Sequence, residues 1–161
     1  MMKSPGLLVV AILGATLFAQ SRPARAACTA EAAASALLDK YVAAVNAHDT
    51  SSFGDIHTEN YIQHSGRSPN GLAAQIENFR AIFAGMPDIQ ARVEDRIIQC
   101  DKIVARVTFS ATHTRPLQGI APTGRPLTLR TIDIWRVENG KLAEHWDVVD
   151  YAGLVKQLRG E

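Results

Sequence analysis

The sequence predicts a single α+β domain in which helices pack on one face of an antiparallel sheet. Apolar residues recur at helical spacing as far as residue 84, and beyond Asp88 they alternate with the period of strands. Hydrophobic residues make up 47% of the 161 residues and charged residues 20%, a balance typical of one soluble globular domain. Helices followed by strands, without regular alternation, favour α+β over a parallel α/β architecture.

The first 26 residues predict a secretory signal peptide. "MMKSP" carries one positive charge, the 14-residue apolar run "GLLVVAILGATLFA" follows, and Ala24-Arg25-Ala26 matches an A-x-A cleavage signal. The run is shorter than the ~20 apolar residues of a membrane helix, so no membrane span is expected after cleavage. We therefore expect residues 27–161 to form one mature domain that is periplasmic or secreted.

Charge and cysteine content limit the class of partner. Cleavage would remove three basic residues, Lys3, Arg22 and Arg25, and would lower the formal net charge from +1 to −2. No basic run remains, so nucleic acid is not an expected partner. The mature chain keeps Cys28 and Cys100, which in an oxidising compartment could form one disulfide or remain two thiols.

The N-terminal half predicts three helices. The first spans residues 31 to about 47, with an apolar stripe at Leu37, Tyr41, Ala44 and Val45. Asp49 is placed to cap a short second helix near "TSSFGDIH". The segment "ENYIQHSGRSPNG" has the composition of a loop, and the third helix, residues 72 to 84, ends at "GMPD".

The C-terminal half predicts four strands and a closing helix. The strands are "IQARVEDRIIQ", "KIVARVTFSATHT", "RPLTLRTIDIWRV" and "KLAEHWDVV". Cys100-Asp101 and Glu138-Asn139-Gly140 form the tight turns, and "RPLQGIAPTG" forms a longer loop. Asp150 is positioned to cap the final helix, "YAGLVKQL".

The register of the last hairpin decides which polar side chains share a face. A two-residue Asn139-Gly140 loop would place Asp133 and Asp147 on opposite faces. A three-residue loop that includes Glu138 would oppose Asp133 to His145, and it is preferred because it sorts the side chains better. One face then holds Leu129, Thr131, Asp133, Trp135, His145 and Asp147, and we expect it to line a pocket. The other holds Ile132, Ile134, Leu142, Trp146 and Val148, and we expect it to form a homodimer interface.

Across residues 31–158 the sequence resembles the SnoaL-like polyketide cyclases of the nuclear transport factor 2-like superfamily. The resemblance lies in an ordered set of motifs: "YIQH", "GMPD", "ATHT", "GIAPTGRPL", "IDIWRVENGK" and "EHWDVVD". It implies a cone-shaped fold whose curved sheet encloses a pocket, a dimer through the sheet, and ring closure by intramolecular aldol condensation without metal or cofactor. It also implies that Asp147 is the catalytic aspartate. Three pocket positions differ, since Asp133, Thr131 and Gln63 stand where cyclases carry histidine, glutamine and asparagine.

These observations predict an exported enzyme that performs acid/base chemistry next to a carbonyl on a small apolar or carbonyl-containing molecule. Asp147 would act as the general base, tuned by His145 and Asp133. The expected substrate contacts are Gln63, His64, His113, Thr131 and Trp135. His145 and Trp135 also suit core packing, and His64 and His113 also suit surface loops. No H-x-H or H-x-x-x-H spacing occurs, so no metal site is expected. An isomerase, a hydrolase or a non-catalytic binding protein on the same fold are the alternatives.

Overall fold

The computed structural model describes residues 30–161, which form four helices and five strands. The helices are α1 (Glu31–Asn46), α2 (Phe53–Ile56), α3 (Leu72–Gly85) and α4 (Tyr151–Arg159). The strands are β1 (His57–Gln63), β2 (Gln90–Gln99), β3 (Lys102–Thr112), β4 (Pro126–Glu138) and β5 (Lys141–Val149). The predicted signal peptide and Cys28 lie outside the described residues. Within residues 30–161, none of the helices has the length and apolar character needed to cross a membrane.

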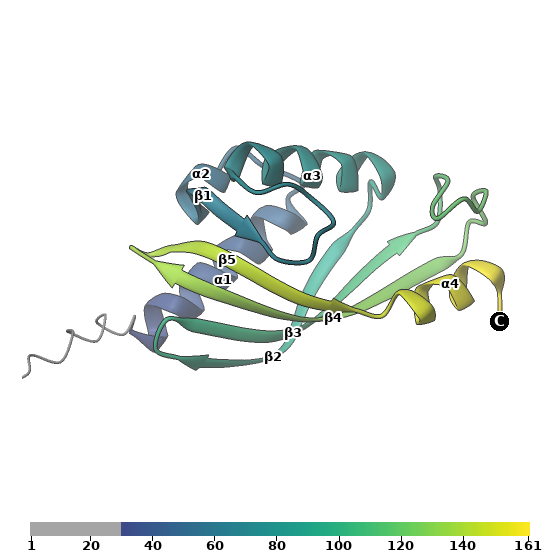
Figure 1. Ribbon diagram of the computed structural model, residues 1–161. Helices are drawn as coiled ribbons and strands as arrows, with labels where there is room; N and C mark the ends of the chain where they lie inside the picture. The colour runs from purple at the N-terminus through teal and green to yellow at the C-terminus, as the bar shows by residue number, and fades with distance from the viewer. Residues whose placement is uncertain (1–29) are drawn as a thin grey trace, which may run out of the picture.

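The five strands form one curved sheet in the order β1-β5-β4-β3-β2 (Figure 1). Strands β2 to β5 pair antiparallel, as predicted, but β1 pairs parallel with β5. The prediction of a loop was therefore wrong for the first part of "ENYIQHSGRSPNG", which lies in β1. The strand "HTENYIQ" lacks apolar alternation because it is an edge strand with only one neighbour, so its sequence carries little strand signal.

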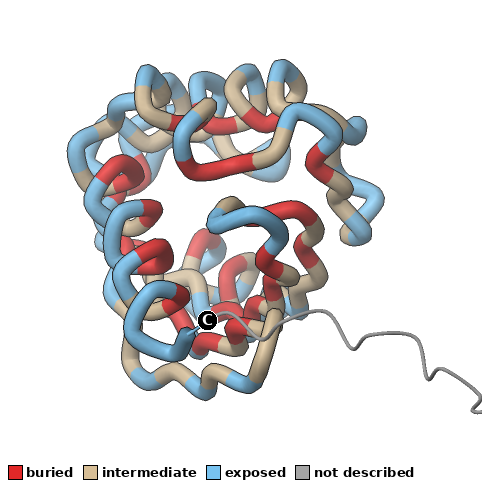
Figure 2. Tube along the Cα trace, turned by 90° about the vertical axis from the view of Figure 1, so that its left-hand side faces the viewer, coloured by how far each residue is buried: buried red, intermediate tan, exposed pale blue. Residues whose placement is uncertain are grey.

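A helical layer covers one face of the sheet and builds the core with it. The buried side of α1 follows helical spacing through Ala34, Leu38, Tyr41 and Val45, and α3 adds Phe79. They pack against inward residues of the strands, namely Ile103, Ala105, Val107, Trp135, Val137 and Leu142. Figure 2 shows buried segments in both layers, turned toward each other. A smaller cluster joins α4 to β4 through Leu127, Leu154 and Leu158.

The helix ends confirm one predicted cap and correct another. Asp150 caps α4, since its Oδ1 accepts a 2.8 Å hydrogen bond from the backbone N–H of Gly153. Asp49 does not cap α2. Its carboxylate instead accepts hydrogen bonds from the N–H and hydroxyl of Ser51, and thereby stabilises the turn before α2.

The β4–β5 hairpin combines a two-residue turn with a bulge, so the predicted three-residue loop was wrong. Glu138 pairs with Lys141, and the turn residues Asn139 and Gly140 have φ of 51° and 75°, the left-handed values of a type I′ turn. The ladder continues with Val137 opposite Leu142, then Arg136 opposite Glu144. Ala143 is therefore the extra residue of a β-bulge.

The bulge restores the side-chain parity that a two-residue turn alone would reverse. Beyond it, Asp133 pairs directly with Asp147, and Trp135 with His145. The predicted inner face is thus confirmed, although Asp133 opposes Asp147 and not His145. On the other face the prediction was wrong for Leu142, which lies beside the bulge and is fully buried in the core. Ile132, Ile134, Trp146 and Val148 do lie on that outer face, because they alternate with the inner residues.

Candidate active site

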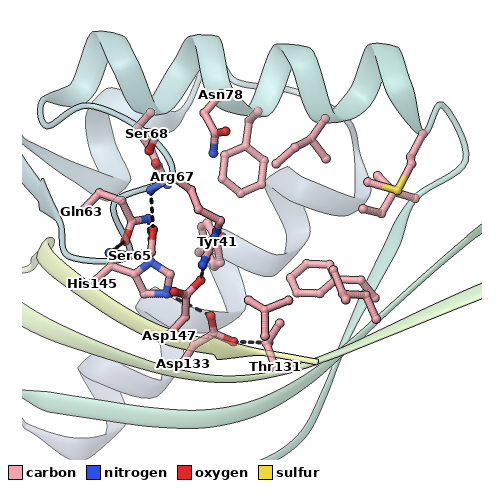
Figure 3. A pocket seen from close by; sticks show the side chains of 18 of the residues that line it. Tyr41, Gln63, Ser65, Arg67, Ser68, Asn78, Thr131, Asp133, His145 and Asp147 are labelled. Atoms are coloured by element: carbon pink, nitrogen blue, oxygen red, sulfur yellow. Dashed lines mark hydrogen bonds and ion pairs between the residues drawn. The ribbon is translucent and has the colours of Figure 1, made fainter. Parts of the chain in front are cut away.

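A cavity of about 240 Å³ lies between the inner face of the sheet and helix α3 (Figure 3). Strands β4 and β5 contribute Thr131, Asp133, His145 and Asp147 to its wall. Apolar side chains from α3 and β3 line much of the remainder, so the polar groups gather at one end of a mostly apolar space. This combination of an apolar enclosure and a few convergent polar groups is typical of small-molecule sites.

A chain of hydrogen bonds fixes the tautomer of His145. The backbone N–H of Ser65 can only donate, and it donates to Gln63 Oε1 over 3.3 Å. The Gln63 amide nitrogen therefore points to His145 Nδ1, 2.9 Å away, and donates to it. Nδ1 must then lack a proton, so the imidazole carries its hydrogen on Nε2 and donates it to Asp133 Oδ1 over 2.9 Å. The arrangement holds a neutral imidazole in one orientation.

The two carboxylates of the site have different partners. Asp133 accepts on both oxygens, from His145 Nε2 and from the hydroxyl of Thr131. Asp147 accepts at Oδ2 from the Arg67 guanidinium, whereas its buried Oδ1 has no hydrogen-bond partner. The Asp147 side chain is only 6% exposed. Asp147 is therefore the carboxylate with an oxygen available to a bound molecule.

Arg67 enters the site from the loop between β1 and α3, and sequence reasoning missed it. This loop folds back because Asn70 Oδ1 accepts from the backbone N–H of Gln63, and Gly71 N–H donates to Tyr61 O. The guanidinium thereby reaches Asp147, 80 residues away in sequence, and lies 5.7 Å from the centre of the Tyr151 ring. No local pattern marks this pairing, because the loop brings the two residues together only in the folded chain.

Tyr41 is the second group that sequence reasoning did not assign to the site. It was interpreted as part of the core stripe of the first helix, and it is buried, but it also lines the cavity. Burial, and to a smaller extent the nearby carboxylates Asp133 and Asp147, raise the pKa of Tyr41 well above its usual value. The phenol therefore stays protonated at neutral pH and can donate a hydrogen bond to a ligand oxygen.

Three predicted substrate contacts do not line this cavity. His64 lies on the outer face, where its ring stacks on Trp146 at 4.3 Å and its Nε2 contacts Glu144. His113 is buried at the base of the 113–125 loop, where Nδ1 accepts from the N–H of Thr123. Trp135 is 2% exposed and stacks on His145 with ring centres 5.0 Å apart, so it supports the imidazole from the core side.

Asp133, His145 and Asp147 also offer ligand atoms that lie within 4.8 Å of one another, close enough for a metal ion. In the observed arrangement, however, His145 Nε2 bears a proton that is shared with Asp133, and Arg67 supplies the positive charge next to Asp147. A cation would have to displace both. The hydrogen-bond pattern therefore fits a network of proton donors and acceptors better than a ligand set.

Known proteins are similar to this chain in sequence and in fold. The sequence profile of the family described as SnoaL-like polyketide cyclase matches residues 35–158. Aklanonic acid methyl ester cyclase from Streptomyces galilaeus is 34% identical over 71 residues, 43% of this chain and 49% of that enzyme. The match thus spans about half the length of this curated relative.

Solved structures extend the similarity over most of the domain. TsrD from Streptomyces laurentii superimposes with a TM-score of 0.75 and 29% identity over 81% of this chain and 97% of its own. A SnoaL-like polyketide cyclase from Agrobacterium tumefaciens gives a TM-score of 0.68 over 76% of this chain and 94% of its own. At 22% identity, the second likeness concerns the fold alone.

Proposed function

The chain belongs to the SnoaL-like polyketide cyclase family, and from this membership we propose that it catalyses acid/base chemistry next to a carbonyl, with Asp147 as the base. Intramolecular aldol cyclisation is the specific reaction that we propose. The observation that supports it most directly is the state of Asp147, a buried carboxylate that faces the cavity with one unpaired oxygen and a guanidinium at the other.

In the proposed reaction, Asp147 Oδ1 removes a proton from the carbon next to a carbonyl of the substrate. The C–H electron pair moves into the C–C bond, and the carbonyl oxygen becomes an enolate. The enolate carbon then attacks a second carbonyl of the same molecule, a C–C bond forms, and the resulting alkoxide takes back the proton. Asp147 thus ends the cycle as it began, as a carboxylate.

Arg67 keeps the charge balanced during this transfer. When Asp147 accepts the proton, its negative charge passes to the enolate oxygen. The Arg67 guanidinium, which bonds to Oδ2 of the same carboxylate, lies near enough to remain beside the negative charge as it moves. Tyr41 can add a neutral donor from the helical side of the cavity.

Asp133 and His145 support Asp147 through their positions. Asp133 faces Asp147 across the β4–β5 pair, so the two carboxylates lie side by side in the wall of the cavity. His145 and Thr131 occupy both oxygens of Asp133, so it does not compete as the base. The relative's name specifies an aklanonic acid methyl ester, and we take a ketone or ester of this general kind as the starting point for a substrate.

The first prediction is that Asp147→Asn abolishes turnover without preventing folding. The substitution keeps the shape but removes the proton acceptor, so the rate should fall by ~10²–10⁴-fold. Aklanonic acid methyl ester serves as the first substrate, with product formation followed by chromatography. The melting temperature and ligand binding should stay close to those of the unaltered protein.

Asp95→Asn is the matched control, because Asp95 pairs with Arg106 on the exposed sheet surface and does not line the cavity. Turnover by this variant should be unchanged. Full activity of Asp147→Asn would assign the chemistry to another group. Binding without turnover by the unaltered protein, for any ketone or ester tried, would favour a binding protein on this fold.

A further inference from the structure

A second cavity, of about 180 Å³, adjoins the candidate active site. The two cavities share six wall residues: Ile82, Met86, Ile89, Phe109, Leu129 and Tyr151. Because the same side chains bound both spaces, only these side chains separate them. Met86 has an unbranched side chain with several rotatable bonds, so it is the most adaptable part of the partition.

The second cavity has a mostly apolar lining. Its other wall residues are four apolar ones, Ala111, Leu117, Leu127 and Leu154, and two polar ones, Ser110 and Gln118. Some buried side-chain polar atoms of residues 30–161 have no partner, but none of them belongs to a residue of this wall. A charged or strongly hydrogen-bonding group would therefore lose its water and gain little in return, whereas an alkyl or aryl group would not.

The inner face of β4 runs from the first cavity to the second, and its residues change from polar to apolar in that direction. Asp133 and Thr131 line the first cavity, Leu129 lines both, and Leu127 lines the second. Successive residues on one face of a strand are about 6.7 Å apart, so Leu129 lies about 13 Å along the strand from Asp133. A molecule that reaches from Asp147, opposite Asp133, into the second cavity must therefore be elongated.

We propose that the second cavity binds an apolar tail of the substrate. The substrate is then an elongated acyl compound, with its reactive carbonyl beside Asp147 and its tail beyond Met86 and Phe109. This inference rests on the proposed function, because it describes another part of the same molecule. An apolar protein cavity of about 150 Å³ holds a benzene molecule, so this one suits a phenyl ring or a chain of about six carbons.

One wall of the second cavity is a surface loop, which gives the tail a route of entry. Leu117 and Ile120 bridge to each other, and Gln118 and Gly119 form the tight turn between them with φ of 51° and 74°. The turn brings Leu117 and Gln118 to the cavity wall, and Gln118 and Gly119 are also exposed to solvent. A wall of this kind can shift more easily than the packed strands opposite it.

Binding of a homologous series tests the inference. Methyl 3-oxoalkanoates with tails of one to ten carbons are titrated into Asp147→Asn by calorimetry, so that turnover does not interfere. Affinity should rise about fourfold for each added methylene, as for burial of a CH₂ group, and should level off near six carbons. An affinity that does not depend on tail length, or no binding by any member of the series, would overturn the proposal.

Two wall variants locate the tail. Ala111→Leu fills the second cavity without touching the first, so the plateau should move to shorter tails, and Leu117→Ala should move it to longer tails. Ala81→Leu, on the exposed side of α3, adds the same side chain as the first variant and should change nothing. Equal length dependence in Ala111→Leu and Ala81→Leu would place the tail elsewhere and refute the assignment.

The outcome is separable from that of the proposed function. If tail length governs binding but the unaltered protein converts no ketone or ester, the proposed chemistry fails and the tail site stands. If the protein turns over its substrate but shows no length dependence, the chemistry stands and the tail site fails.

Discussion

At the scale of single residues, the site depends on which atoms already have partners. Asp133 and Asp147 face each other, but Asp133 has both oxygens occupied and Asp147 has one oxygen unpaired. A chain of hydrogen bonds runs from Ser65 through Gln63 and His145 to Asp133. Because the backbone N–H at its start can only donate and the carboxylate at its end accepts, the position of each hydrogen in the chain is determined. The same residue types without this order would not define which carboxylate reacts.

Gln63→Glu should change the protonation of His145. A carboxylate at this position accepts where the amide donates, so Nδ1 gains a proton and the imidazole becomes charged between two acceptors. Nitrogen NMR of labelled histidine should show Nδ1 unprotonated in the unaltered protein and protonated in the variant at the same pH.

Gln75→Glu is the matched control for this charge change. Gln75 is buried and lines the same cavity, but it makes no hydrogen bond to His145. The His145 nitrogen signals should therefore stay as in the unaltered protein. A protonated Nδ1 in the unaltered protein would contradict the tautomer that we derive.

His57 should make the folded protein sensitive to acid. Its ring lies in the core beside Tyr41, Phe53 and Tyr61, and burial lowers its pKa from 6.5 to about 4. Between pH 6.5 and pH 4, His57 binds a proton in the unfolded chain but stays neutral in the folded chain. The free energy of unfolding therefore falls as the pH drops toward 4. The loss attributable to this residue should approach about 3 kcal/mol.

Urea unfolding of the unaltered protein and of His57→Phe, between pH 7 and pH 4, measures this contribution. The variant keeps an aromatic ring but cannot bind a proton, so its stability should fall less over this range. Between pH 7 and pH 8 the two profiles should run parallel. Parallel profiles down to pH 4 would show that His57 does not couple folding to protonation.

At the scale of elements, the β4–β5 hairpin sets the geometry of the site through its turn and its bulge. The type I′ turn at Asn139 and Gly140 starts the ladder, and the bulge at Ala143 then shifts it by one residue. Without that shift Asp147 would lie on the face opposite to Asp133. Two local features that do not line the cavity therefore place the proposed base inside it.

Gly140→Ala should destabilise the hairpin by about 1 kcal/mol. A Cβ at this position meets no atom within 4 Å, so the cost comes only from the left-handed φ of 75°. Gly85→Ala is the matched control, since a Cβ there also meets nothing, and the residue ends α3 with ordinary φ. Urea melts should show Gly85→Ala equal to or more stable than the unaltered protein. Equal effects of both substitutions would argue against the type I′ turn.

At the scale of the whole molecule, the outer face of the sheet carries exposed apolar side chains. Ile132 and Val148 pair across β4 and β5 and are 51% and 73% exposed, and Ile97 on β2 is 70% exposed. Exposed apolar groups gathered on one face of a small domain favour association. Among the described residues, this face is the best candidate for a contact with a second copy of the chain.

We predict a symmetric homodimer through this outer face. Val148→Lys places a charge at its most exposed apolar position and should yield monomers by light scattering at micromolar concentration. Ala43→Lys, on the exposed side of α1, should leave the dimer intact. A monomeric unaltered protein would refute the prediction.

Export with loss of residues 1–26 also stays a prediction, which the intact mass of the secreted chain would check.

The sequence alone was sufficient for most of the elements. Period-2 alternation located β2 to β5, and helical spacing located α1 and α3, because each element has one face in the core and its pattern repeats locally. The cap residue Asp150 indicated α4. The same alternation placed Thr131 with Asp133 on one face of β4, and His145 with Asp147 on one face of β5. Parity along a strand depends only on neighbouring residues, so it could be predicted without the fold.

Only the tertiary structure decided the contacts between distant segments. The parallel pairing of β1 with β5 brings Gln63 beside His145, and the loop that follows β1 brings Arg67 to Asp147. Each contact joins residues about 80 positions apart through a segment with little periodicity, so no local pattern could indicate it. The sequence therefore determined which residues share a face within each strand. The fold, through the bulge at Ala143, determined that Asp133 and Asp147 share the pocket, and it also determined which of them keeps an oxygen available for chemistry.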